Sequence, residues 1–422
     1  MMDASALPER PHQRSMSARC CIVGGGPAGM MLGYLLGRAG VETLVLEKHG
    51  DFLRDFRGDT VHPSTLQIMD ELGLLESFLE RPHQEVRRLR GQFGKAMFQI
   101  ADLERLNVKS RFVAFMPQWE FLNFLFEQGA RFPSLRVLRN TEVIDLVRNG
   151  ETIAGVVART EAGMLTVEAD LTIGCDGRHS IVRERAGLAV VNIGAPIDVL
   201  WFRVGKAADV ADPALLHAEP GRLLVTIDRG DYWQCAFVIP KGGAEAVRGG
   251  GLPAFRTTIA EMLPVLRGHI DKLQDWDDVK LLTVAIDRLT QWSRPGLLCI
   301  GDAAHAMSPV GGVGINLAVQ DAVATANLLA EKLRRGCPTA RDLGAVGARR
   351  LFPAKVIQSI QVQIQNRVIS PTLKGGELKA PAVLKLVDAM PWLQGLTARI
   401  IGMGVRPEHV RSPVLPAADR EP

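Results

Sequence analysis

A glycine-rich turn between an apolar strand and an apolar helix is the feature that most constrains the fold of this chain. Residues Cys20–Val23 form a short apolar run that is typical of a buried parallel strand. The sequence Gly24-Gly25-Gly26-Pro27-Ala28-Gly29 follows at once, and apolar residues then recur at helical spacing as far as Gly40. A second apolar run, Val41–Leu46, ends at Glu47. The pattern predicts a strand–helix–strand unit that binds a dinucleotide.

The residues of this turn have distinct predicted roles. Gly24 allows a tight turn, Gly26 lets the backbone approach a pyrophosphate, and Gly29 allows the helix to pack closely on the strand. The helix opens with Pro27 and Ala28, and its first amides attract phosphate charge. A glycine-rich turn in an unrelated α/β protein is the alternative, and the motif alone does not distinguish FAD from NAD.

The acidic residue at the end of the second strand supports the dinucleotide interpretation. Glu47 is placed to accept hydrogen bonds from ribose hydroxyls. A carboxylate at this point disfavours a 2′-phosphate, so we do not expect NADP in this slot.

Two further motifs follow strand-like apolar runs later in the chain. The first is Cys175-Asp176-Gly177-Arg178-His179-Ser180-Ile181-Val182-Arg183, and the second runs from Gly301-Asp302 to Asn316. With the first turn, they resemble the single-component FAD-dependent aromatic hydroxylases, the monooxygenases typified by para-hydroxybenzoate hydroxylase. The resemblance covers about residues 18 to 345. It is specific because the three motifs lie far apart and occur in the family's order.

The resemblance implies an α/β fold with a Rossmann-like FAD-binding domain, an interleaved β-sheet substrate domain and a C-terminal helical segment. Alternating apolar runs around the turn at residues 228–231 are typical of a strand hairpin in that sheet. The expected boundaries are residues 19–85, 116–187 and 287–345 for the FAD-binding domain, 86–115 and 188–286 for the substrate domain, and 346–405 for the helical region. Residues 1–18 are expected to be a disordered extension, and 406–422 a loose tail.

The resemblance also implies cofactor contacts. Asp302 corresponds to the aspartate that bonds the ribityl chain, Asp176 to the one that holds the loop behind the pyrophosphate, and Pro309 to a proline on the substrate side. The backbone amides of Ile315 and Asn316 correspond to those at the flavin N1–C2=O edge. The full set of expected cofactor residues is Gly24, Gly26, Pro27, Ala28, Gly29, Glu47, Lys48, Arg57, Gln118, Val143, Asp176, Gly301, Asp302, Pro309, Gly312, Gly314, Ile315 and Asn316.

Three of these assignments have plain structural alternatives. Arg57 is also explained as a surface arginine in a charged loop, and Gln118 as a polar residue at a helix start. The Asp176-Gly177 pair on its own would be read as a turn.

The substrate side is less defined by the sequence. The family's best-known member uses tyrosines to ionise a phenol, but this chain has only Tyr34 and Tyr232. Tyr34 lies in the first helix and is interpreted as core, so a tyrosine relay is not transferred. The catalytic base stays open, with His217, Tyr232 and Arg203 as candidates.

The implied activity is that of an FAD-dependent monooxygenase. It would use NADPH or NADH and O2 to hydroxylate an electron-rich, aromatic or polyphenolic small molecule through a C4a-hydroperoxyflavin. Alternatives are a flavin-dependent reductase or dehydrogenase, a halogenase, or a non-enzymatic flavin-binding protein. Scattered tryptophans without a Trp-x-Trp pair disfavour a halogenase. The lack of a second GxGxxG after a strand agrees with a reductant that binds only transiently.

Composition and charge argue against several other classes of protein. A net charge of +4 without a basic block argues against nucleic acid. Six cysteines without a CxxC pair predict reduced thiols and no metal site. The polar N-terminus does not resemble a signal peptide, and no run of about 18 apolar residues predicts a membrane span. We expect a cytoplasmic protein whose partners are its small-molecule substrate, O2 and NAD(P)H, and the sequence leaves a homodimer open.

Overall fold

The computed structural model describes residues 14–53, 60–206, 215–376, 378 and 380–415. Its larger sheet has eight strands in the order β19-β20-β11-β1-β2-β8, with β10 paired to β11 and β9 paired to β10. Strands β20, β11, β1, β2 and β8 are parallel to one another. The bounds are β1 (Arg14–Val23), β2 (Thr43–Leu46), β8 (Leu135–Leu138), β9 (Glu142–Asn149), β10 (Thr152–Thr160), β11 (Gly163–Gly174), β19 (Ser293–Arg294) and β20 (Leu297–Cys299).

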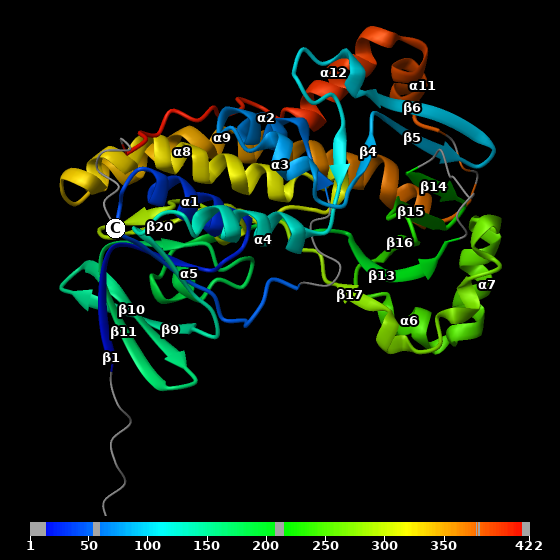
Figure 1. The fold of residues 1–422 in the computed structure, drawn as a ribbon. Coiled ribbons are helices and arrows are strands. Elements are labelled where there is room, and N and C mark those ends of the chain that lie inside the picture. The colour runs from blue at the N-terminus through cyan, green and yellow to red at the C-terminus, as the bar shows by residue number, and fades with distance from the viewer. Residues whose placement is uncertain (1–13, 54–59, 207–214, 377, 379, 416–422) are drawn as a thin grey trace, which may run out of the picture.

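A layer of helices covers this sheet on one side (Figure 1). Helix α8 (Gly314–Arg335) packs between α1 (Pro27–Arg38) and α9 (Ala340–Ile364), and α1 also packs on α4 (Gln118–Gly129). The segment Val310–Arg335 is long and apolar enough to cross a membrane, but 78% of its most apolar 18-residue stretch is buried inside the protein. It is a core helix of the fold.

The second sheet has seven strands in the order β17-β13-β16-β15-β14-β5-β6, shown on the right of Figure 1. Strands β5 and β6 come from the predicted segment 86–115 and join through a parallel pairing of β5 with β14. Two helices that the sequence analysis did not predict, α6 (Ala244–Gly249) and α7 (Leu252–Met262), cover one face. The strands are β5 (Arg88–Phe93), β6 (Ala96–Asp102), β13 (Ile197–Gly205), β14 (Leu216–Glu219), β15 (Arg222–Asp228), β16 (Tyr232–Pro240) and β17 (Lys280–Leu282).

Small elements join the two sheets. A three-stranded sheet has the order β3-β7-β4, and β12 pairs with β18. The predicted α/β fold, with its Rossmann-like unit, second sheet and C-terminal helices, is confirmed. The remaining bounds are β3 (Thr60–Val61), β4 (Gln84–Val86), β7 (Val113–Phe115), β12 (Val190–Asn192), β18 (Asp287–Leu289), α2 (Pro63–Glu71), α3 (Leu75–Leu79), α5 (Ile181–Arg185), α10 (Ser370–Leu373), α11 (Ala382–Ala389) and α12 (Pro391–Gly402).

Both predicted disordered ends need correction. Strand β1 begins at Arg14, and its first residues pair with Leu165–Ala169 of β11, so residues 14–18 belong to the sheet. At the other end, Glu408 is only 4% exposed, and the amide of Leu415 donates to the Arg38 carbonyl at 3.0 Å. Residues 406–415 are therefore anchored rather than loose. Their polar groups find partners on distant helices, which local composition does not reveal. Residues 1–13 and 416–422 lie outside the described residues.

Candidate active site

Strand register brings the three sequence motifs together. Val23 of β1 lies beside Leu46 of β2 and Gly174 of β11, and Gly174 lies beside Cys299 of β20. Because these strands are parallel, the segments that follow them emerge at the same edge of the sheet. This is the edge at which open α/β sheets bind ligands.

The motifs also contact one another. Gly24 has a φ of +103°, and a Cβ there would lie 2.5 Å from the Cys175 carbonyl oxygen. A Cβ on Gly301 would lie 3.1 Å from the Cβ of Ala28. Each of these glycines permits a contact between segments more than a hundred residues apart.

A charged pair joins the second motif to the third. The Arg178 Nη2 atom lies 3.7 Å from the Asp302 Oδ2 atom, and both side chains are partly exposed. With the two glycine contacts, this pair means that each motif touches the other two.

The first turn forms a cradle that fits a phosphate group. A Cβ on Gly29 would lie 2.0 Å from the Gly24 carbonyl oxygen, so glycine is required for the packing of α1 on the turn. A Cβ on Gly26, by contrast, would meet no described atom within 4 Å. Helix α1 has no acidic residue in its first turn and no side-chain cap among the described residues. Its first amides therefore face an open space suited to an anion.

Glu47 is fixed beside this cradle. Its side chain is 6% exposed, and its Oε2 atom accepts a hydrogen bond from the Gly25 amide at 2.8 Å. Its Oε1 atom accepts from the His49 amide at 3.0 Å. The carboxylate lies at the carboxyl end of β2, next to the turn.

Asp176 of the second motif holds a loop. It accepts hydrogen bonds from the Ser180 hydroxyl and from the Val182 amide, the latter at 3.1 Å. Burial raises the pKa of Asp176, although these hydrogen bonds act in the opposite direction. The side chain thereby stabilises the start of α5, and the backbone of the loop stays in contact with Gly24.

The third motif is fastened to β3. Gly312 has a φ of +63°, and a Cβ there would lie 2.3 Å from the Thr60 Oγ1 atom, which donates to the Gly312 carbonyl at 2.8 Å. The Asn316 Oδ1 atom accepts from the His62 amide and the Thr65 hydroxyl, both at 2.8 Å. The Asn316 side chain is thus used within the protein, so a flavin contact would come from its backbone.

Helix α8 presents a second uncapped N-terminus at the site. It has no acidic residue in its first turn and no side-chain cap among the described residues. A Cβ on Gly314 would meet no described atom within 4 Å. The helix has 22 residues, and its positive end suits a group that gains negative charge on reduction.

The comparisons with known proteins identify the family. Residues 17–359 match the family model described as FAD binding domain. The chain belongs to this family. It is 33% identical over 393 residues to 6-methylpretetramide 4-monooxygenase of Streptomyces rimosus, covering 93% of this chain and 94% of that protein. It is also 26% identical to dialkyldecalin synthase of Streptomyces rugosporus, covering 96% and 84%. An anhydrotetracycline hydroxylase structure from Streptomyces rimosus superposes with a TM-score of 0.74 at 21% identity, covering 93% and 77%.

The chain is therefore an FAD-dependent monooxygenase, and the resemblance read from the sequence is confirmed. FAD is its cofactor, and NAD(P)H is the reductant typical of the family. The cradle at Gly26 and the open α1 and α8 N-termini fit this cofactor. Within the described residues, no group of three or more metal-ligating side chains is present.

The structure describes three further predicted cofactor residues of this flavin monooxygenase. Lys48 is exposed directly after Glu47, and Val143 is 7% exposed in β9. Gln118 is 9% exposed at the first position of α4. Arg57 falls outside the described residues.

Sequence reasoning missed a buried ion pair behind the third motif. The Arg350 Nε atom lies 2.8 Å from the Asp321 Oδ1 atom, and His305 Nε2 lies 2.5 Å from Asp321 Oδ2. Burial raises the pKa of Asp321, but the electrostatic interactions and hydrogen bonds with His305 and Arg350 outweigh burial and hold this pKa below its ordinary value. The signal available in the sequence was an acidic residue, Asp321, within the mostly apolar stretch 317–330.

The substrate-side candidates of the flavin monooxygenase separate onto two faces of the second sheet. Tyr232 and Arg203 lie on the face that packs against Val310, and the Arg203 guanidinium is 5.2 Å from the Tyr232 ring centre. His217 pairs with Leu224, whose side chain belongs to the opposite face. Helix α7 covers that face, so His217 does not join the other two candidates.

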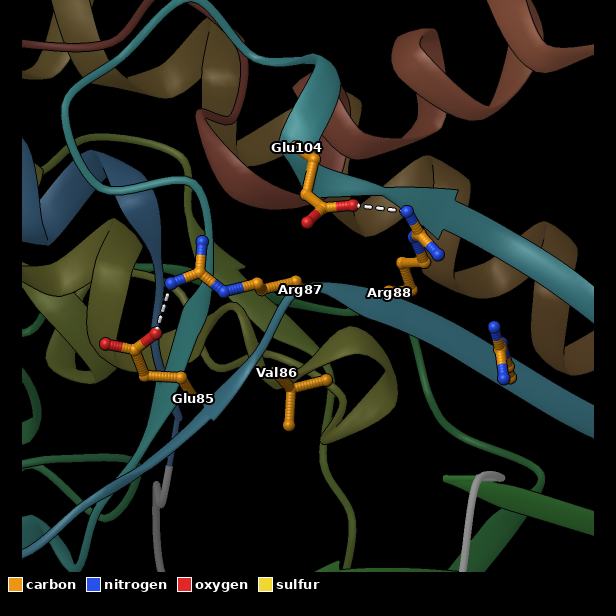
Figure 2. Close-up of a pocket in the computed structure, with 6 residues that line it drawn as sticks. Glu85, Val86, Arg87, Arg88 and Glu104 are labelled. Atoms are coloured by element: carbon orange, nitrogen blue, oxygen red, sulfur yellow. Dashed lines mark hydrogen bonds and ion pairs between the residues drawn. The ribbon is translucent and has the colours of Figure 1, made fainter.

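A surface hollow lies away from this site. It has a volume of about 380 Å³ and is lined by Glu85, Val86, Arg87, Arg88, Arg90 and Glu104. Figure 2 shows Arg87 directed to Glu85 and Arg88 to Glu104, with hydrogen bonds of 2.6 Å in both pairs. No predicted site residue lines this hollow. Its charges are mostly paired with one another, and we assign it no role in the reaction.

Proposed function

We propose that this monooxygenase hydroxylates an electron-rich aromatic ring of a polycyclic, polyketide-type natural product. The relative that is 33% identical to it carries the name of an enzyme acting on 6-methylpretetramide, and the match spans 93% of this chain. This near full-length similarity is the observation that carries the proposal. When bound, FAD accepts a hydride from NADPH or NADH and activates O2 for transfer to the substrate.

The residues of the cofactor site have separate proposed tasks. The amides at the start of α1 bind the pyrophosphate beside Gly26, and Glu47 accepts from the ribose. Asp302 accepts from the ribityl chain. The α8 N-terminus, beginning at Gly314, stabilises negative charge on the flavin pyrimidine edge. None of these tasks requires a proton transfer by the protein.

The substrate is proposed to lie between the second sheet and the segment that contains Pro309. The face of that sheet that carries Arg203 and Tyr232 packs on Val310, next to this proline. Either side chain would contact a phenolic oxygen from there. We leave the catalytic base unassigned, and we drop His217 because its side chain lies on the other face.

We also propose a domain division, a cellular location and an oligomeric state. Residues 19–85, 116–187 and 287–345 would form the FAD-binding domain, and 86–115 with 188–286 the substrate domain. None of the six cysteines, all within the described residues, forms a disulfide, which supports a reducing, cytoplasmic location. Exposed apolar side chains on α11 and α12 support a homodimer: Val383, Leu386, Trp392 and Leu396.

The test begins with the purified protein. We expect bound FAD, oxidation of NADPH or NADH that accelerates with a polycyclic phenol, and a product heavier by one oxygen atom. A product of unchanged mass formed without NAD(P)H would contradict the proposal and favour the type of reaction named for the dialkyldecalin synthase relative. A gain of halogen or of two hydrogens would favour the other flavin chemistries.

A further inference from the structure

The segment 406–415, which we call the strap, crosses the FAD-binding half of the molecule after α12. It runs along the outer side of α8 towards the C-terminal end of the described chain (Figure 1). The Glu408 amide donates to the Gln320 Oε1 atom at 3.3 Å, and Asn327 bonds the His409 carbonyl at 2.8 Å and the Arg411 amide at 2.7 Å. The strap is therefore fixed along α8 by side chains of that helix.

One strap residue enters the protein interior. The Glu408 carboxylate lies 2.7 Å from Arg349 Nε and 3.4 Å from Arg350 Nη1. The side chains of Glu408 and Arg350 are 2% and 0% exposed, whereas Arg349 is 44% exposed. A buried carboxylate with these partners is strongly dependent on them, because removal of one partner leaves an uncompensated charge.

Arg350 continues the contact to the cofactor motif. Its Nε atom lies 2.8 Å from Asp321 Oδ1, and the Oδ2 atom of the same carboxylate accepts from the Gly301 amide at 3.1 Å. Gly301 has a φ of +61° and directly precedes Asp302. A continuous buried path thus links the strap to the turn that carries Asp302.

We propose that Glu408, Arg350 and Asp321 are positioning residues for the cofactor. Glu408 orients Arg350, and Arg350 together with His305 holds the Asp321 carboxylate directed at the Gly301 amide. The strap thereby sets the position of Asp302, 106 residues earlier in the sequence. This inference rests on the proposed role of Asp302 as an acceptor for the ribityl chain.

The first test uses Glu408→Gln, which keeps the size of the side chain and removes its charge. We expect FAD to bind about tenfold or more weakly. At saturating FAD, we expect a shifted visible circular dichroism spectrum and a shifted flavin reduction potential. The matched control is Glu71→Gln, which removes a surface contact of the strap with His409 and Val410 and leaves the buried path intact. FAD affinity in the control should stay within about twofold.

A milder variant covers the case in which Glu408→Gln fails to fold. Arg349→Gln removes the half-exposed partner of Glu408 and leaves Arg350 in place. It should weaken FAD binding in the same direction, by about threefold. Unchanged FAD affinity and spectra in folded Glu408→Gln, or in folded Arg349→Gln when the first variant is lost, would overturn the inference.

A double variant tests whether the path acts through Asp302. In an Asp302→Ala background, Glu408→Gln should weaken FAD binding by less than about twofold more, since the residue it positions is gone. If Glu408 contributed only to the stability of the fold, Glu408→Gln would weaken FAD binding as much in the Asp302→Ala background as it does in the wild type. Failure of the wild-type protein to bind FAD would refute the proposed function, whereas fully additive losses would refute only the positioning path.

Discussion

Two glycines of the first turn should respond in opposite ways to the same substitution. Gly26 has φ and ψ of −77° and −174°, values open to any residue, and a Cβ there meets no described atom within 4 Å. Gly26→Ala should therefore fold normally, with a gain of about 0.4–1 kcal/mol from the less flexible unfolded chain. In Gly29→Ala the new Cβ would lie 2.0 Å from the Gly24 carbonyl oxygen, which belongs to the backbone. Such overpacking costs about 1–3 kcal/mol.

FAD affinity should separate the two variants as well. The methyl group of Gly26→Ala would stand in the space through which the pyrophosphate approaches the α1 amides. Loss of one charge-assisted hydrogen bond costs about 1.5–3 kcal/mol, which corresponds to roughly ten- to hundredfold weaker binding. Gly29→Ala should lose stability first and FAD only as a consequence.

The assay combines denaturant unfolding of the FAD-free variants with titration of FAD by fluorescence. Gly26→Ala should raise the unfolding midpoint slightly and lose FAD affinity, and Gly29→Ala should lower the midpoint. FAD binding by Gly26→Ala within twofold of the wild type would refute the assignment of this cradle to the pyrophosphate. Unchanged stability of Gly29→Ala would refute the packing argument.

Three further predictions concern single side chains. Glu47→Ala should weaken FAD binding about ten- to hundredfold, without changing the rate of flavin reduction at saturation; a changed rate would place Glu47 elsewhere. Asp302→Ala should slow hydroxylation and release more peroxide per NAD(P)H, since a ring displaced by about 1 Å costs on the order of a hundredfold in rate. If the amount of peroxide released per NAD(P)H is unchanged, Asp302 serves only to form the turn. Burial lowers the pKa of His62 to about 4, from 6.5. The unfolded chain therefore takes up a proton first as the pH falls, and stability should drop by about 3 kcal/mol from pH 6.5 to 4. If a His62→Gln variant loses as much stability over the same pH range, protonation of His62 is not the cause of the loss.

Much of the candidate cofactor site could be predicted from the sequence because its signals are local. The glycine turn, the helix that starts at Pro27 and the acid at Glu47 lie within 24 residues, and each follows from short-range spacing. Gly314, which the resemblance implied as a cofactor residue, is the first residue of α8. Local backbone requirements leave direct marks in a sequence.

The substrate side was predicted less completely, because strand pairing decides on which face of the sheet a side chain lies. His217 and Tyr232 were equivalent candidates in the sequence. The register of β14 with β15 directs His217 towards α7, and the register of β13 with β16 directs Tyr232 to the other face. A shift of one residue would exchange these faces, so no local pattern decides between them.

The sequence by itself predicted a dinucleotide site at the first turn, and it showed three motifs in the order of a flavin monooxygenase. Only the tertiary structure decided how they meet. Parallel register brings Gly24, Asp176 and Asp302 to one sheet edge, and the strap joins Glu408 to Asp321 through Arg350. These contacts span many residues, and buried charges are stable only when a distant partner neutralises them. These distant charged groups come into contact only when the chain is folded.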